Sequence, residues 1–309
     1  MVRAGIVTEN DVNFWDYDGT LLYAYSKSGF LSLAAMPSNP EHDDLTAQGW
    51  NWTFVNAQSY VRTYGKLDIG QMYATSDNKT RLYITLGDVR LSPYLGIGVK
   101  GTAVVDWGDG SATTTLTGSN VTTIIYTQHT YPEAGDYVIS ISGNIGFGNK
   151  TILRASNTGS PDNQDIIYAS ALTRVEIGNI TSIQSGAFYN CYSLANITMP
   201  STITSIGTNA FRSCRSLDFI TIPTGVKKTQ SSSFYYCYSL HAVALPHELT
   251  EIAGSSFYAC YSLTRITIPD LVTTIGNSAF YQEYALSEVV MPNSVTSLGT
   301  KVFYNTNSL

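Results

Sequence analysis

The chain has 309 residues, of which 43% are hydrophobic and only 13% are charged, and its formal net charge is −6. This length is sufficient for two or three domains, each with a buried core. The sequence has no basic stripe that could neutralise a phosphate backbone, so we expect no nucleic-acid partner. It also has no apolar run near the roughly 18 residues of a membrane-spanning helix and no secretory signal, so we expect no membrane insertion.

Residues 1–81 are predicted to form a small α+β module that is rich in Trp and Tyr. Apolar residues at 12–15 and 21–25 flank a stretch of turn-forming residues, which indicates two strands joined by a turn. A helix is expected over residues 53–64, since Thr53 is a good N-cap residue and a glycine follows the last apolar position. Two further stretches are predicted to pair as a hairpin: residues 69–76 and 81–86.

The turn after the first predicted strand contains Asp16-Tyr17-Asp18-Gly19-Thr20. It resembles the D-x-D-G-T motif of haloacid-dehalogenase-type phosphatases, where the first Asp attacks phosphorus and the second is the general acid/base. That chemistry also requires a doubly wound sheet and further carboxylates for Mg²⁺, and no β-α alternation follows here. A tight turn explains the motif without chemistry. We therefore predict no enzymatic activity and keep a Mg-dependent phosphatase, through Asp16 and Asp18, as the alternative.

The acidic stretch Glu41-His42-Asp43-Asp44 suggests a metal cluster at first sight. Consecutive residues cannot easily all face one ion, so we interpret this stretch as a solvated loop.

Two motifs in the middle of the chain, V-V-D-W-G-D-G-S at 104–111 and H-T-Y-P-E-A-G-D-Y-V-I-S at 129–140, resemble a PKD-type domain. The resemblance implies an immunoglobulin-like β-sandwich over residues 82–145, serving as a spacer or interaction module rather than an enzyme. Polar residues of these motifs could form a site, but capping of turns is the interpretation that we favour. These residues are Asp106, Asp109, His129 and Asp136.

A repeat of 23 residues occupies residues 172–309, where phenylalanine, leucine and proline recur at that spacing, for example from Phe188 to Phe211. Apolar and polar residues alternate over 263–268, which predicts a short strand with one buried face. The proline that follows ends the ladder because it has no N–H to donate. One unit cannot bury its own Phe and Leu, so neighbouring units must stack, and a period of 20–29 residues is typical of a leucine-rich solenoid.

The unit L-x-x-I-x-I-P-x-x-V-x-x-I-G-x-x-A-F-x-x-C-x-x-L resembles the BspA-type leucine-rich repeat of bacterial surface proteins and some bacteriophage proteins. The sequence departs from this unit at Thr229-Gln230, where Ile-Gly is expected, and at Glu283 and Thr306, where Cys is expected. These departures predict a looser third repeat and a partly exposed cysteine column.

The four cysteines keep the same period, so they are expected to lie one above another, about 5 Å apart. Disulfides are sterically conceivable, but we favour a reduced ladder of small, semi-buried thiols. No Cys-x-x-Cys or nearby His completes a ligand set, so neither a metal site nor a cofactor is predicted. The cysteines are Cys191, Cys214, Cys237 and Cys260.

The predicted fold is thus multidomain: an α+β module (1–81), a PKD-like sandwich (82–145), and a leucine-rich repeat solenoid of about six coils (146–309). Its first coil is irregular and is expected to act as a cap. Leu309 ends a regular repeat without a polar cap. We therefore expect another subunit or a partner to cover that edge, with possible self-association through it, or the native chain to continue.

Two kinds of column are expected to face solvent: strand positions on the concave sheet and tyrosine positions on the other side, where Arg212 and Arg215 break two tyrosine columns. Stacked tyrosines offer the amphipathic area that is favoured at interfaces and under sugar rings, although they could simply form the convex wall. The candidate interaction residues are Tyr189, Tyr192, Tyr235, Tyr238, Tyr258, Tyr261, Tyr281, Tyr284, Tyr304, Arg212, Arg215, Phe219, Arg265 and Glu288.

The function predicted from these features is that of a non-enzymatic, surface-displayed interaction or adhesion protein that binds a protein or glycan on a bacterial surface. The missing signal favours a phage virion protein for host binding or decoration, located on the virion surface or outside the cell. The alternatives are a bacterial cell-surface adhesin of the BspA type and a purely architectural solenoid covered by copies of itself.

Overall fold

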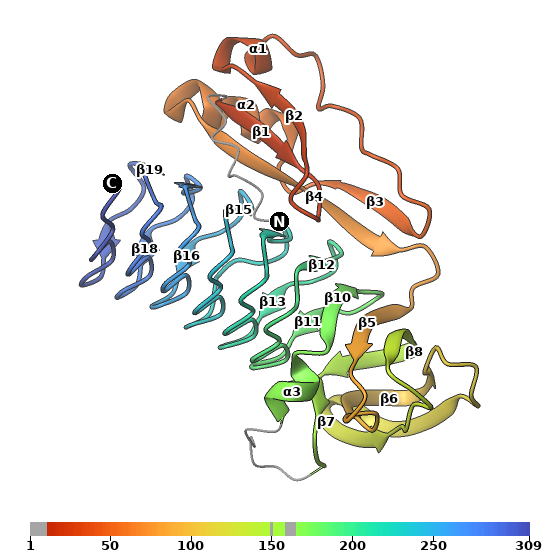
Figure 1. Ribbon diagram of the computed structural model, residues 1–309. Coiled ribbons are helices and arrows are strands. Elements are labelled where there is room, and N and C mark those ends of the chain that lie inside the picture. The colour runs from red at the N-terminus through yellow and green to blue at the C-terminus, as the bar shows by residue number, and fades with distance from the viewer. Residues whose placement is uncertain (1–10, 149–150, 158–164) are drawn as a thin grey trace.

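The computed structural model describes residues 11–148, 151–157 and 165–309 (Figure 1). In this part of the chain, no helix is long and apolar enough to cross a membrane. The described residues form a small sheet with helices, a larger and mostly antiparallel sheet, and a stack of short parallel strands. Figure 1 shows the small sheet beside the stack and the larger sheet at the end where the stack begins.

The small sheet has the strand order β2-β1-β4-β3. β1 (Val12–Trp15) pairs antiparallel with β2 (Leu21–Tyr25) and parallel with β4 (Leu67–Thr75). The other edge of β4 pairs antiparallel with β3 (Leu45–Trp50). The predicted strand–turn–strand at the start of the chain is therefore present. We call residues 11–75 the N-terminal module.

Helices α1 (Lys27–Leu31) and α2 (Phe54–Tyr64) complete the N-terminal module. The Thr53 side chain caps α2 by accepting a hydrogen bond from the backbone N–H of Asn56. Gly65 ends the helix with a φ of 90°, a left-handed conformation that glycine adopts without a steric penalty. Both ends of this helix agree with the prediction.

The hairpin predicted for residues 69–76 and 81–86 is wrong. β4 and β5 (Thr80–Leu86) belong to different sheets, because both edges of β4 are already paired with β1 and β3. All nine residues of β4 are buried, which is typical of a central strand covered on both faces. The chain therefore passes directly from one sheet to the next.

The larger sheet has the order β12-β10-β5-β8-β6-β7, and β9 also pairs with β6. Its long strands β6, β7 and β8 pair antiparallel, with bulges on β6 that bend the strand. The middle of the chain therefore belongs to one continuous sheet whose hydrophobic core is shared with the repeats, and the two facing sheets of a PKD-like sandwich are not shown. The strands are β6 (Tyr94–Asp106), β7 (Thr114–Gln128), β8 (Gly135–Phe147), β9 (Leu153–Arg154), β10 (Leu172–Glu176) and β12 (Asn196–Thr198).

This larger sheet continues into the repeats, because β10 pairs antiparallel with β5 on one side and parallel with β12 on the other. Phe147 of β8 lies 5.0 Å from Phe188, the first ring of the phenylalanine column, and α3 (Asp165–Ala169) lies nearby (Figure 1). The leading edge of the solenoid is thus covered by the sheet itself. Residues 149–150 and 158–164 of the predicted capping segment lie outside the described residues.

Most repeats contribute two short strands, one to each of two parallel ladders, and the phenylalanine rings of successive repeats stack with centroids 5.1–5.6 Å apart. The first ladder forms what we call the strand face. In it β12 is followed by the pair β14 (Phe219–Thr221) and β15 (Ala242–Ala244), and then by the pair β17 (Arg265–Thr267) and β19 (Glu288–Val290). The second ladder comprises β11 (Ser182–Ile183), β13 (Ser205–Ile206), β16 (Glu251–Ile252), β18 (Thr274–Ile275) and β20 (Ser297–Leu298).

The cysteine column is free of disulfides, as predicted, but it is fully buried rather than partly exposed. The Cys214 thiol donates a hydrogen bond of 3.2 Å to the carbonyl of Phe188 in the preceding repeat, and Cys237 and Cys260 do the same one and two repeats later. Burial raises the pKa of Cys191 to about 12, so this thiol stays protonated and unreactive.

The third repeat is irregular where the sequence predicted looseness, since it has an isolated bridge from Lys228 to Glu251 in place of a strand, but side-chain hydrogen bonds hold this segment. Thr229 is buried, and its hydroxyl lies 2.7 Å from that of Ser256 and accepts a bond from the Ala253 N–H. These side-chain bonds replace the Ile-Gly contacts of the other repeats.

Candidate interaction surface

The N-terminal module covers the strand face of the repeats, and this corrects the prediction that the strand columns face solvent. Phe219 is fully buried, with its ring centroid 5.6 Å from that of Trp15 on β1. Trp15, Phe219, Ala242 and Ala244 form an apolar cluster between module and repeats. Phe219, Arg265 and Glu288 are therefore occupied within the chain.

Three side chains of the module donate hydrogen bonds to backbone carbonyls at the ends of repeat strands. The Ala244 carbonyl also accepts a backbone hydrogen bond from Ile222, and burying a carbonyl without any partner is costly. The pairs are Asn51 with Ala244 at 3.0 Å, Trp52 with Leu245 at 2.8 Å, and Tyr60 with Ile268 at 2.6 Å.

Two ion pairs extend this seam. Asp68 of β4 accepts hydrogen bonds from Nη2 and Nε of Arg265 at 2.6 and 3.1 Å, and both side chains are largely buried. Nζ of Lys66 lies 2.7 Å from Oε1 of Glu288, in a more exposed position. Burial alone would lower the pKa of Arg265, but the Asp68 charge outweighs it and raises that pKa, so the guanidinium is always charged.

The sequence did carry a signal of this docking, which the prediction missed. The strand-face columns change residue type from repeat to repeat, from Phe219 to Ala242 to Arg265, because each position meets a different part of the module.

Gly70 provides a direct test of the docked arrangement. A Cβ at this position would lie 2.1 Å from Oγ1 of Thr221 and 2.8 Å from Cβ of Ala244. Gly70→Ala is expected to lower the free energy of unfolding by about 1–3 kcal/mol, measured by urea denaturation of the full chain. Gly87→Ala is the control, since nothing lies within 4 Å of its Cβ. Equal stability of both variants would contradict the docking.

The two aspartates of the phosphatase-like motif hold a turn, as predicted. Asp18 accepts a hydrogen bond from the N–H of Thr20 at 2.9 Å, and Asp16 accepts one from Tyr17. Asp16 is buried and lies 2.9 Å from Nε2 of His42, a contact that the interpretation of residues 41–44 as a solvated loop missed. Within the described residues, no group of three His, Cys, Asp or Glu side chains could hold a metal ion.

The polar residues of the PKD-like motifs also cap turns. Asp106 and Asp109 accept hydrogen bonds from backbone N–H groups two residues later, and Asp109 also contacts His129 at 2.7 Å. Burial alone would raise the pKa of Asp109, but the hydrogen bonds from Ser111 and His129 lower it to about 2. Asp136 accepts a hydrogen bond from the Thr85 hydroxyl at 2.6 Å.

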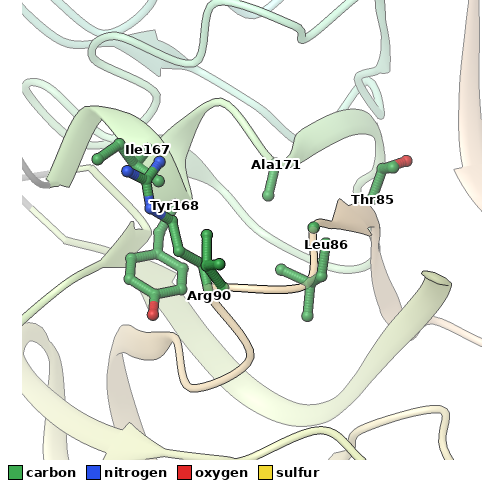
Figure 2. A pocket seen from close by; sticks show the side chains of 8 residues that line it. Thr85, Leu86, Arg90, Ile167, Tyr168 and Ala171 are labelled. Carbon is green, nitrogen blue, oxygen red and sulfur yellow. The ribbon is translucent and has the colours of Figure 1, made fainter. Parts of the chain in front are cut away.

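Two cavities of about 170 Å³ each lie at the junctions of these parts. One lies on the seam between module and repeats, where Trp15, Asp68, His241 and Glu288 contribute to its lining. The other lies between α3 and the loop after β5, and Figure 2 shows its largely apolar lining with Arg90 as a charged side chain.

The tyrosine columns lie on a part of the repeats that the N-terminal module does not contact through any described hydrogen bond or ring contact. In both columns the rings stack face to face, with centroids 4.5–5.2 Å apart. Burial raises the pKa of Tyr258 and Tyr261, which keeps these hydroxyls neutral. We call these two columns together the tyrosine face: Tyr189, Arg212, Tyr235, Tyr258, Tyr281 and Tyr304 in one, and Tyr192, Arg215, Tyr238, Tyr261 and Tyr284 in the other.

The two arginines continue the tyrosine columns instead of breaking them. The Arg212 guanidinium lies 4.5 Å from the Tyr235 ring centroid and 5.8 Å from that of Tyr189. Arg215 lies 4.1 Å from the ring centroid of Tyr192 and 5.5 Å from that of Tyr238. A planar guanidinium fits between aromatic rings and is attracted by their negative faces, so the stack stays intact.

Stacking determines what the tyrosine face can offer. Ring faces inside the columns are already covered by neighbouring rings, so the outward groups are phenol edges, hydroxyls and guanidinium edges. More open rings occur at the C-terminal end, where Tyr284 and Tyr304 are 41% and 50% exposed. The interior of the columns is therefore a hydrogen-bonding surface, and open ring faces of the kind that sugar stacking needs are confined to its C-terminal end.

Comparison with known proteins identifies the repeats. No curated protein matches the chain. Solved structures with likeness to it include a leucine-rich repeat protein of T. pallidum (28% identity, 44% of this chain and 62% of that one, TM-score 0.34) and a leucine-rich cell surface protein of Faecalibacterium prausnitzii (29%, 44% and 42%, 0.36). The chain thus spans less than two thirds of these proteins. Residues 181–309 match the BspA type leucine-rich repeat region in six copies, so this part of the chain is a BspA-type leucine-rich repeat region.

Proposed function

We propose that the chain is a non-enzymatic interaction protein displayed on a cell or virion surface, and that it recognises its partner through the tyrosine face. The observation that carries this proposal is that the chain itself covers one surface of the repeats and leaves the other uncovered. The strand face is occupied by the chain's own N-terminal module, whereas the tyrosine face has no such cover among the described residues.

The composition of the tyrosine face supports this proposal. Tyrosine provides large, stiff contact area with few rotatable bonds, so little conformational entropy is lost when a partner binds. Stacking restricts the rings further, which reduces that loss again. The BspA-type repeat adds support, because the sequence resembles repeats of bacterial surface proteins. A protein or glycan on a bacterial surface is the partner class that we propose.

Removal of the hydroxyls tests this proposal without disturbing the stack. The variant with Tyr258→Phe, Tyr261→Phe and Tyr281→Phe keeps all ring contacts but loses three hydroxyl groups of the tyrosine face. Binding of the labelled full-length protein to intact bacterial cells is expected to weaken by roughly tenfold or more, at about 0.5–1.5 kcal/mol per hydrogen bond.

Tyr94→Phe, on β6 and outside the repeats, is the matched control and is expected to bind like the unaltered protein. Unaltered binding by the triple variant would refute the role of the tyrosine face. Absence of cell binding by the natural chain would refute the recognition function and favour an architectural solenoid, which a self-assembly measurement would then show.

A further inference from the structure

The tyrosine face contains two positively charged side chains, which are not needed to recognise neutral groups. Arg212 and Arg215 lie in one repeat, three residues apart, and each guanidinium lies between two tyrosine rings. Such packing fixes the plane of the guanidinium. Nε of Arg212 is buried without a hydrogen-bond partner, so a ligand would bind that side chain through its two terminal nitrogens, whereas the Arg215 side chain is exposed. A guanidinium held this way loses less conformational freedom when it binds a ligand.

The charge of these two guanidiniums is not compensated within the described part of the chain. Neither Arg212 nor Arg215 has a carboxylate within ion-pair distance there, and the tyrosine face contains no acidic residue. Four other arginines are paired with carboxylates: Arg81 with Asp77, Arg154 with Asp165, Arg174 with Glu176, and Arg265 with Asp68. Arg62 and Arg90 have no such partner in the described part of the chain either, but they do not lie side by side in one repeat. In a chain with a formal net charge of −6, two adjacent unpaired cations on one surface indicate an anionic ligand.

Carboxylates fit this site best. A planar guanidinium donates two parallel N–H bonds to a carboxylate, and such charge-assisted pairs are about twice as strong as neutral hydrogen bonds. Neighbouring tyrosine hydroxyls in the same columns can donate to a second acceptor or accept from a backbone N–H. The arrangement therefore suits an extended chain that carries both carboxylates and amides.

An acidic polypeptide is favoured over an acidic polysaccharide by the geometry of the rings. The interior ring faces are covered by stacking at 4.5–5.2 Å, so a sugar cannot pack its apolar face on them. We propose that the tyrosine face binds an acidic polypeptide segment, with Arg212 and Arg215 holding its carboxylates. This inference rests on the proposed recognition function and specifies its partner.

Binding of the full-length protein to fluorescently labelled poly-L-glutamate tests the proposal, with polygalacturonate as the acidic polysaccharide. We expect tighter binding to polyglutamate, and weaker binding as NaCl rises from about 50 to 300 mM because salt screens the charges. Arg212→Gln with Arg215→Gln is expected to weaken polyglutamate binding by about tenfold or more. Arg212→Lys with Arg215→Lys is expected to keep only part of the polyglutamate binding of the natural protein, because an ammonium cannot bind a carboxylate through two parallel bonds.

Arg62→Gln with Arg90→Gln removes the same charge from other parts of the protein and is the matched control, expected to bind polyglutamate normally. Equal or tighter binding of polygalacturonate would overturn the polypeptide assignment, and normal polyglutamate binding by the double glutamine variant would overturn the role of the arginines. Cell binding that is lost in the triple phenylalanine variant but kept in the arginine variant would refute this inference while leaving the proposed function intact.

Discussion

Replacement of Arg265 by methionine is expected to lower the free energy of unfolding by about 3–5 kcal/mol, because the buried carboxylate of Asp68 would lose its counter-charge. Asp68 is 4% exposed, so bulk water solvates this carboxylate poorly. Hydrogen bonds from Asn13 and Trp15 to Asp68 would remain, but they do not supply a positive charge. Urea denaturation of the full chain measures the change.

Two further variants separate the buried pair from the exposed one. Lys66→Met removes the partner of Glu288, where both side chains are about one third exposed, and it is expected to cost only about 0–1 kcal/mol. Combining Arg265→Met with Asp68→Asn removes both charges and is expected to recover part of the lost stability. A cost for Arg265→Met as small as that for Lys66→Met would show that the seam is open to water.

Glu283→Cys is expected to stabilise the protein at neutral pH. Glu283 occupies the cysteine column in the fifth repeat, is fully buried, and accepts a hydrogen bond from the backbone N–H of Cys260 at 2.9 Å. Burial without a counter-charge raises its pKa from 4.5 to about 9. The folded protein therefore keeps this carboxyl protonated at pH 7, whereas the unfolded chain releases the proton.

This difference determines the pH dependence. The carboxyl disfavours folding least below pH 4.5, where both states are protonated, and stability falls as pH rises from 4.5 to about 9. At pH 7 the cost is on the order of 3 kcal/mol, at about 1.4 kcal/mol per pH unit. Urea denaturation between pH 5 and 8 should show that the stability advantage of Glu283→Cys over the natural protein grows as the pH rises. Thr306→Cys, in the same column, should keep the natural dependence of the free energy of unfolding on pH. Equal slopes in both variants would contradict the buried, protonated carboxyl.

The solenoid could be predicted from the sequence because its contacts join residues one repeat apart, and such contacts repeat with the chain. The stacked phenylalanines and thiols follow from that period alone. The docked module could not be predicted this way, since Asn51 and Trp52 contact residues 193 positions later, and one long-range contact leaves no period. The same reason explains why the predicted hairpin was wrong. β4 pairs with β1 and β3, which precede it in the chain, and the local turn after β4 carries no information about these pairings.

The tyrosine columns of the candidate surface were predicted for the same local reason, but their chemistry was not. In the sequence pattern, Arg212 interrupts a tyrosine column. In the structure, its planar guanidinium lies between the rings of Tyr189 and Tyr235 and takes the place of a tyrosine ring. Likewise, the D-G-T turn was predicted from turn-forming residues, but the contact between Asp16 and His42 depends on the path of the intervening chain.

The docking of the N-terminal module on the later repeats also constrains the order in which the molecule is completed. A ribosome adding about 5–20 residues per second needs on the order of 10–40 s to make the 193 residues that separate Trp52 from its hydrogen-bond partner Leu245. During that interval Trp15 and Trp52 face solvent instead of the repeats. The repeats can stack from neighbour to neighbour as they emerge, but the nascent protein closes only when the strand face is complete.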